Sequence, residues 1–98
     1  MGDWKLLREG IQIKSLVKDP ERGIQMDIIK LAPGLDDPPH WHNGFEWVYI
    51  LEGSMEDDKG LHKKGDFLLN YKDQKHKVRT EEGCTALIVW TGSVRHEP

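Results

Sequence analysis

Cysteine is nearly absent from this 98-residue chain, which contains only Cys84. A single thiol cannot form an internal disulfide, so a small secreted fold held together by disulfides is excluded. Cys84 begins the apolar run 84–90, which is typical of a buried strand. We therefore expect Cys84 to be a small, unreactive core residue rather than a nucleophile.

Long apolar runs and blocks of basic residues are also missing. No stretch approaches the roughly 20 apolar residues that cross a bilayer, and the N-terminus lacks the apolar core of a secretion signal. The 14 Lys and Arg are scattered among 17 Asp and Glu, which gives a formal net charge of -3. Because this distribution lacks the basic patch of a nucleic-acid-binding protein, we expect a cytoplasmic protein that binds neither nucleic acid nor membrane.

The sequence shows no sustained helical period; its best helical candidate is the short segment 4–10. Short apolar runs recur instead, separated by clusters of Gly, Pro and Asp. These runs are 11–17, 24–31, 45–51, 66–69 and 85–90. Many short strands with frequent turns predict an all-β sandwich or barrel, and the length predicts a single domain over residues 1–98.

The run 45–51 has two apolar faces, because successive side chains of a strand point to opposite sides. One face would carry Glu46, Val48 and Ile50, and the other Phe45, Trp47, Tyr49 and Leu51. An exposed row of this second kind would be a large apolar patch and needs a cover. We expect a homodimer, or a terminal strand folded over that face.

Four side chains, His40, His42, Glu46 and His76, form a candidate metal site. His-x-His places two imidazoles on the same face of one strand, and a carboxylate four residues further on can fold back across the bend at 43–44. A third histidine from a distant segment would close the ligand shell. This set suits divalent Fe, Mn, Zn, Ni or Cu and does not select one of them.

The glycines around these residues make the spacing resemble the first conserved motif of the cupin superfamily. The match runs Gly34, five residues, His40-Trp41-His42, three residues, Glu46, six residues, Gly53. The second cupin motif is matched in part, over residues 65–80. Gly65 and His76 hold their places there, while Tyr71, Asp73 and Thr80 stand where the motif has Pro, Gly and Asn.

The resemblance implies a double-stranded β-helix, the jelly-roll barrel of RmlC-like cupins, with the metal in its mouth. By motif position Tyr71 lies at this mouth, where it could orient a substrate or cover the core as an edge aromatic. Gln74 shares the strand parity of His76 and could line the cavity as a hydrogen-bond donor or pack beside a turn. We expect His62 and His96 to be solvated surface histidines.

A narrower resemblance is to the cupin domain of ChrR-type anti-sigma factors and their single-domain relatives. It is carried by Glu46, 48–54, Asp58, Gly60, 65–66, His76 and 82–84. Relatives of this type include metal-dependent dioxygenases that act on diketones and aromatic ketones. ChrR proteins carry a separate N-terminal zinc domain that holds the sigma factor, and the first 33 residues here contain neither Cys nor His, so we expect that sigma-factor binding is not inherited.

The resemblance leaves three functions open. The first is a metal-dependent, non-haem dioxygenase that oxidises a small chelating carbonyl or enol. The second is a non-enzymatic sensor or regulatory cupin whose metal site reports a small molecule to a partner protein. In the third, the metal mainly stabilises a fold with a small core.

Overall fold

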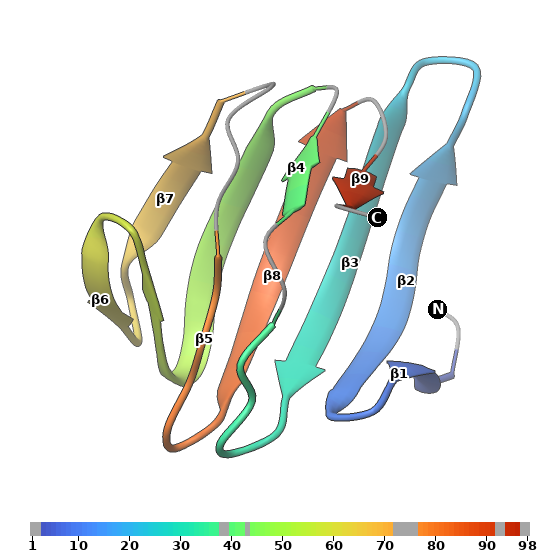
Figure 1. The fold of residues 1–98 in the computed structure, drawn as a ribbon. Coiled ribbons are helices and arrows are strands. Elements are labelled where there is room, and N and C mark those ends of the chain that lie inside the picture. The colour runs from blue at the N-terminus through green and yellow to red at the C-terminus, as the bar shows by residue number, and fades with distance from the viewer. Residues whose placement is uncertain (1–2, 38–39, 43, 72–76, 92–93, 97–98) are drawn as a thin grey trace.

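The computed structural model describes residues 3–37, 40–42, 44–71, 77–91 and 94–96 (Figure 1). Over these residues the chain forms nine strands and no helix, so the all-β prediction is confirmed. The strands are β1 (Lys5–Arg8), β2 (Ile11–Asp19), β3 (Ile24–Leu31), β4 (His40–His42), β5 (Glu46–Asp57), β6 (Gly60–Lys63), β7 (Phe67–Asn70), β8 (Cys84–Thr91) and β9 (Val94–His96). The described residues include no helix with the length and apolarity that crossing a bilayer requires.

Each apolar run predicted as a strand overlaps an observed one, whereas the helical candidate at 4–10 was wrong. That segment contains β1, which pairs antiparallel with β2 through Lys5 opposite Ile13 and Leu6 opposite Gln12. As a strand, the segment gains backbone hydrogen bonds to β2. As a helix of one or two turns it would be only marginally stable, because short helices are marginal on their own.

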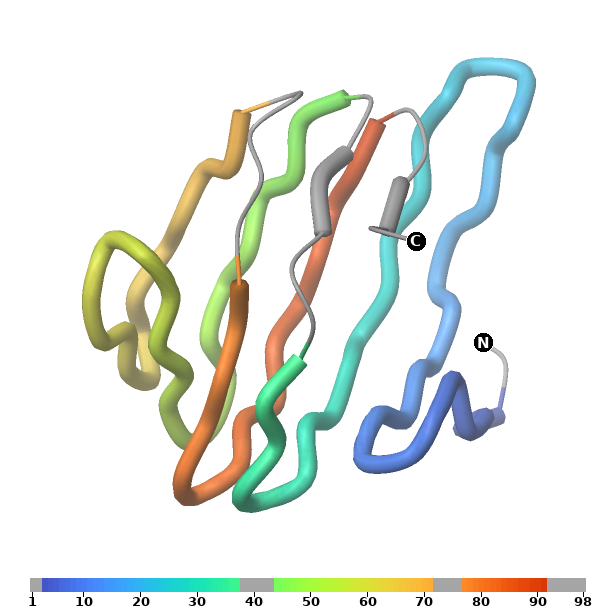
Figure 2. The backbone as a smooth tube through the Cα atoms, viewed as in Figure 1, coloured from blue at the N-terminus to red at the C-terminus, as the bar shows by residue number. Residues whose placement is uncertain are grey.

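Seven strands form one antiparallel sheet in the order β1-β2-β3-β8-β5-β6, and β7 pairs with the first part of β5. Strands β4 and β9 pair with each other, with His40 opposite His96 and His42 opposite Val94. Figure 1 draws this pair in front of the large sheet, and Figure 2 shows the same path of the chain. The pair is part of a second layer that covers one face of the sheet.

The long strand β5 connects the two layers. A bulge between Ile50 and Glu52 shifts its register with β8, and Gly53 follows with φ +74°. A Cβ on Gly53 would lie 2.0 Å from the Gly83 carbonyl oxygen, so this crossing requires glycine. Beyond it, β5 pairs with β6, and the Glu56 N–H donates to the Arg79 carbonyl at 2.7 Å.

The rest of the second layer is held by backbone bonds between two connecting segments. The N–H of Asp37 donates to the carbonyl of Val78 at 2.8 Å, and the N–H of Thr80 donates to the carbonyl of Leu35 at 2.9 Å. Arg8 of β1 forms an ion pair with the Asp37 carboxylate. This contact ties the edge of the large sheet to the second layer and helps to close the barrel.

The apolar core lies between the two layers, on the inner face of the large sheet. Its buried members are Ile11, Leu31, Val48, Ile50, Met55, Val78, Cys84, Ala86 and Ile88. The predicted parity of β5 is confirmed, because Glu46, Val48 and Ile50 are buried while Tyr49 on the other face is 39% exposed. The sequence pattern of this strand therefore fixed which of its faces meets the core.

Candidate functional site

Polar side chains gather at one end of the inner face. Across four neighbouring strands the register aligns Asn70 with Glu46, Glu46 with Trp90, and Trp90 with Gln25. We call these four residues the polar row, and the end of the barrel that holds them the polar end. It is the upper end in Figure 1, where β5 begins and where β7 and β8 finish. The opposite, apolar end contains Ile11, Leu31 and Cys84, which are also aligned by register.

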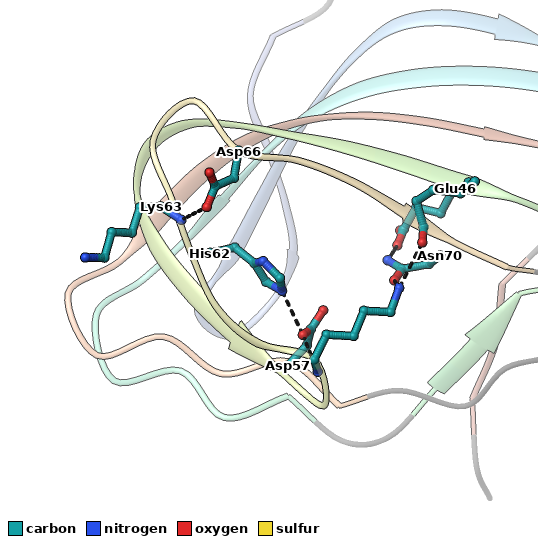
Figure 3. A network of polar contacts seen from close by, with 8 residues as sticks. Glu46, Asp57, His62, Lys63, Asp66 and Asn70 are labelled. Atoms are coloured by element: carbon teal, nitrogen blue, oxygen red, sulfur yellow. Dashed lines mark hydrogen bonds and ion pairs between the residues drawn. The ribbon is translucent and has the colours of Figure 1, made fainter.

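Glu46 is the member of the predicted metal site whose side chain the structure describes. Its carboxylate is buried, with the residue only 5% exposed, and its Oε1 accepts a hydrogen bond from Asn70 Nδ2 at 2.8 Å (Figure 3). The side-chain oxygen of Asn70, Oδ1, in turn accepts from the Lys59 ammonium at 3.4 Å. The same ammonium donates to the backbone carbonyl of Leu69 at 2.9 Å. Asn70 thus holds one oxygen of Glu46 in a fixed position, a role that sequence reasoning missed.

The start of β5 is anchored so that Glu46 cannot easily shift. The Phe45 N–H donates to Thr91 Oγ1 at 2.9 Å, and the Thr91 N–H donates to the Phe45 carbonyl at 3.0 Å. Gly44 packs directly against this threonine, because a Cβ there would lie 2.1 Å from the Thr91 carbonyl oxygen. Close packing therefore explains why a glycine occupies the bend between the histidines and Glu46.

The other predicted ligands are placed less completely. His40 and His42 lie on the short strand β4, two residues apart, but their side chains fall outside what the structure describes. His76 and the expected pocket residue Gln74 lie outside the described residues altogether. Among the side chains that are described, no three His, Cys, Asp or Glu come together as a metal site. The four-ligand set thus stays a prediction.

Tyr71 lies on the other side of the sheet from the expected pocket. It directly follows the inward-facing Asn70, so strand parity turns it outward. Its ring packs edge-on against Phe45, with 6.0 Å between the centroids, and the residue is 53% exposed. Of the two roles expected for Tyr71, these contacts favour the edge aromatic over a residue that orients a substrate.

A second carboxylate, Asp27, lies on the inner face of β3 and is fully buried. Its Oδ2 accepts two hydrogen bonds, from Trp90 Nε1 at 2.8 Å and from Gln25 Nε2 at 2.7 Å. Two members of the polar row are therefore fixed by this carboxylate. Sequence reasoning missed Asp27, although its alternation with Ile29 and Leu31 in the run 24–31 was a signal that it faces inward.

His62 was expected to be a solvated surface histidine, and its surroundings differ from this. His62 is not a fully solvated histidine: its Nε2 lies 2.8 Å from Asp57 Oδ1, and the two side chains are 13% and 2% exposed (Figure 3).

A pocket of about 300 Å³ lies beside the β5–β6 hairpin, where Arg79 is paired with Glu56 and with Glu81. The Arg79 guanidinium in the lining of this pocket is therefore already neutralised by carboxylates. The pocket shares no lining residue with the polar row.

Cys84 is a buried free thiol at the apolar end. Burial, followed by the nearby charge of Glu82, raises the pKa of the thiol to about 11. At neutral pH the thiolate is thus strongly disfavoured, in agreement with the expected inert core residue.

Solved structures with the same architecture cover nearly the whole chain. An RmlC-like cupin from Ralstonia eutropha JMP134 superposes with a TM-score of 0.89 at 19% identity, over 98% of this chain and 67% of its own. An acetylacetone dioxygenase from Acinetobacter johnsonii gives 0.88 at 17% identity, over 97% and 72%. At these identities the likeness establishes the fold alone.

A third solved structure is the complex of SigE with the anti-sigma ChrR from Rhodobacter sphaeroides. The match has a TM-score of 0.79 at 22% identity and covers 92% of this chain, which spans about half (49%) of the chain it matches. No curated protein matches the sequence. The ChrR cupin-like domain family, in contrast, matches residues 2–95. With this match over most of its length, the chain belongs to the ChrR cupin-like domain family, and it has the fold of the RmlC-like cupin structure.

Proposed function

We propose that this chain, as one cytoplasmic cupin domain over residues 1–98, binds a divalent metal ion and acts as a metal-dependent dioxygenase on a small chelating carbonyl or enol. The proposed ligands are His40, His42, Glu46 and His76, and the metal could be Fe, Zn, Mn or Ni. The observation that carries the proposal is the buried Glu46 carboxylate, held by Asn70 on the inner face at the polar end.

The residues present fit such an ion. Burying a carboxylate is costly unless it is paired, hydrogen-bonded or bound to a metal, and Glu46 is placed where β4 and its two histidines precede β5. Imidazole and carboxylate are suitable ligands for the proposed ions. A metal bound here would supply Lewis acidity and open coordination positions for the oxygens of a substrate.

The chain itself would orient and enclose the substrate. Asn70 fixes Glu46, and the Thr91 contacts hold the start of β5, so that the carboxylate is preorganised. Trp90 offers an aromatic surface whose N–H is already satisfied by Asp27. The apolar rows beyond, with Val48 and Ile88, exclude water from the deeper barrel.

Metal analysis followed by oxygen uptake tests this proposal. Protein purified without chelator or nickel affinity resin should contain about one divalent ion per chain, and adding a β-diketone to the Fe(II)-loaded form should consume O2. Glu46→Gln should weaken metal binding by more than the roughly 10- to 100-fold typical of residues that only orient a ligand. Asp66→Asn, an equivalent change at an exposed position, is the control. Wild-type protein that binds no divalent ion would contradict the proposal.

The alternative is a non-enzymatic sensor, which the match to the ChrR cupin-like family favours. In this case the metal-loaded protein would bind a small molecule without consuming O2, and a partner protein would co-purify with an inert Zn(II) form. Oxygen uptake by the Fe(II) form would exclude it.

We also propose a homodimer formed by the outer face of the large sheet. Register aligns Phe67 with Tyr49 and Tyr49 with Leu87, and Phe67 is 64% exposed. Among the described residues no terminal strand covers this face, since β1 pairs at the sheet edge and β9 with β4. A second copy would bury an apolar area that is too large to be left exposed.

Sedimentation equilibrium tests the dimer. Wild-type protein should sediment as a dimer at micromolar concentration, and Phe67→Glu should shift it towards the monomer. Leu61→Glu, a change at an exposed residue of β6, should leave the mass unchanged. A wild-type monomer would refute the interface.

A further inference from the structure

Among the described residues, none is a hydrogen-bond partner for one carboxylate oxygen of Asp27, although Asp27 is fully buried. Its Oδ2 accepts from Trp90 and Gln25, but no described group donates to Oδ1. Buried polar atoms nearly always have a partner, and a carboxylate oxygen that lacks one is among the most costly exceptions. Such an orphaned acceptor calls for a specific explanation.

The side chain cannot relieve this cost by a simple rotation. Two donors from two strands hold Oδ2, so turning the carboxylate would move the deficit from one oxygen to the other. A carboxylate offers only acceptors, and no described Lys or Arg forms an ion pair with Asp27. Oδ1 is therefore a preorganised acceptor that lacks its donor.

Asp27 lies within reach of a molecule bound at the polar end. Its register partner is Ile88, two residues before Trp90, which is itself aligned with Glu46. The backbones of Asp27 and Glu46 are thus about 7 Å apart along the strands and about 10 Å apart across them. Because both side chains point inward, a ligand of fewer than ten or so heavy atoms could contact both.

We propose that Asp27 Oδ1 accepts a hydrogen bond from the ligand of this barrel, which therefore carries a hydroxyl or amino donor in addition to its metal-chelating oxygens. The second half of this statement rests on the proposed function. A simple β-diketone in its keto form has only acceptors and would leave Oδ1 unsatisfied. Sites with a buried polar group discriminate strongly against analogues that lack the matching group.

A metal-free measurement tests Asp27 by itself. Phenol and anisole differ by the O–H donor, and ligand-detected NMR on apo protein compares their affinities. Phenol should bind at least tenfold more tightly than anisole, and Asp27→Leu should reduce this preference to less than twofold. In Asp27→Asn, which keeps one oxygen for Trp90 and replaces the other with an NH2 donor, the preference should likewise fall below twofold, because the oxygens of phenol and anisole can both accept from an NH2. Asp66→Asn is the matched control and should keep the wild-type preference.

Equal binding of phenol and anisole by wild-type protein, or binding of neither, would overturn the proposal. So would a phenol preference that survives in Asp27→Leu. The wild-type comparison needs no variant, so poor folding of Asp27→Leu leaves the proposal falsifiable.

A second measurement separates this proposal from the proposed function. Zn(II)-loaded protein is titrated with a β-diketone and with the same diketone bearing a terminal hydroxyl. If the phenol preference holds but neither diketone binds, the Asp27 subsite stands and the chelating-substrate proposal fails. If both diketones bind equally, the metal proposal stands and the donor requirement fails.

Discussion

The two ends of the inner face share strands β3 and β8, yet the side chains that they bury differ in chemical character. At the apolar end Ile11, Leu31 and Cys84 are packed without any need for hydrogen bonds. At the polar end Glu46, Asn70 and Asp27 are equally buried but take part in specific hydrogen bonds. The difference teaches that the apolar end contributes mainly stability, since buried polar groups stabilise little unless they are satisfied, and that the polar end is the place for the proposed binding site.

The largest expected effect is a loss of folding stability when a side chain of the apolar core is shortened. Ile50 of β5 is fully buried in the core beside Ala86 of β8, so Ile50→Ala removes packing that its neighbours cannot replace. Urea denaturation should show a loss of about 4 kcal/mol in the free energy of unfolding. Leu61→Ala, at an exposed position of β6, should cost less than about 1 kcal/mol. A loss at Ile50 as small as this would show that the two ends do not differ as described.

The next effect is a pH dependence at Cys84. Burial raises the pKa of its thiol from 9.0 to about 11, so the folded chain resists an ionisation that the unfolded chain undergoes near pH 9.0. The resulting stability is fully present below pH 9 and is lost as the pH rises from 9 to 11, by at most about 3 kcal/mol. Thermal unfolding of wild type and Cys84→Ala across this range should show a steeper decline for wild type, and parallel curves would contradict the assignment.

A smaller effect is expected at the polar end, from the residue that holds Glu46. Asn70→Leu removes the donor to the Glu46 carboxylate without changing the proposed ligands. Calorimetric titration should show a metal Kd that is about 10- to 100-fold weaker. The control is Leu68→Ala, two residues before Asn70 on the same face of β7. It should lower stability while leaving the metal Kd near its wild-type value. If both variants bind metal equally, Asn70 has no positioning role.

The smallest effect concerns Lys59, whose ammonium reaches Asn70 from the exposed hairpin. Interactions of exposed charges are weak and screened, so Lys59→Met should change the metal Kd by less than about threefold. Repeating the titration at high salt should remove even this difference. An effect as large as that of Asn70→Leu would instead make the lysine part of the site.

Much of the fold could be predicted because the strands carry a clear local pattern. The alternation of Val48 and Ile50 with Tyr49 was sufficient to assign the inner face of β5. In contrast, residues 4–10 could not be assigned as a strand from the sequence and were only the best helical candidate. The reason is that β1 is stabilised by pairing with β2, and strand pairing is not a local property. His62 was misjudged for a similar reason, since its environment depends on Asp57 across the hairpin turn.

The candidate site was predictable only in part. Motif spacing pointed to Glu46 and the histidines as candidates, because His40 and His42 lie two residues apart on one strand and Glu46 follows after a short bend. Asn70 and Asp27 belong to no such interval. Their importance follows from lying beside Glu46 and Trp90 on neighbouring strands, and a list of residues in chain order does not contain that information.

By itself the sequence determined the all-β class and the inner face of β5, because these depend on periodicity along single segments, and its motif spacing supplied the proposed metal ligands. Only the tertiary structure decided that Tyr71 faces outward beside Phe45 and that Asn70 holds Glu46. It alone also showed a buried carboxylate oxygen of Asp27 without a donor. The physical reason is that hydrogen bonding and burial depend on which strands become neighbours, and that choice is made by the packing of the whole barrel.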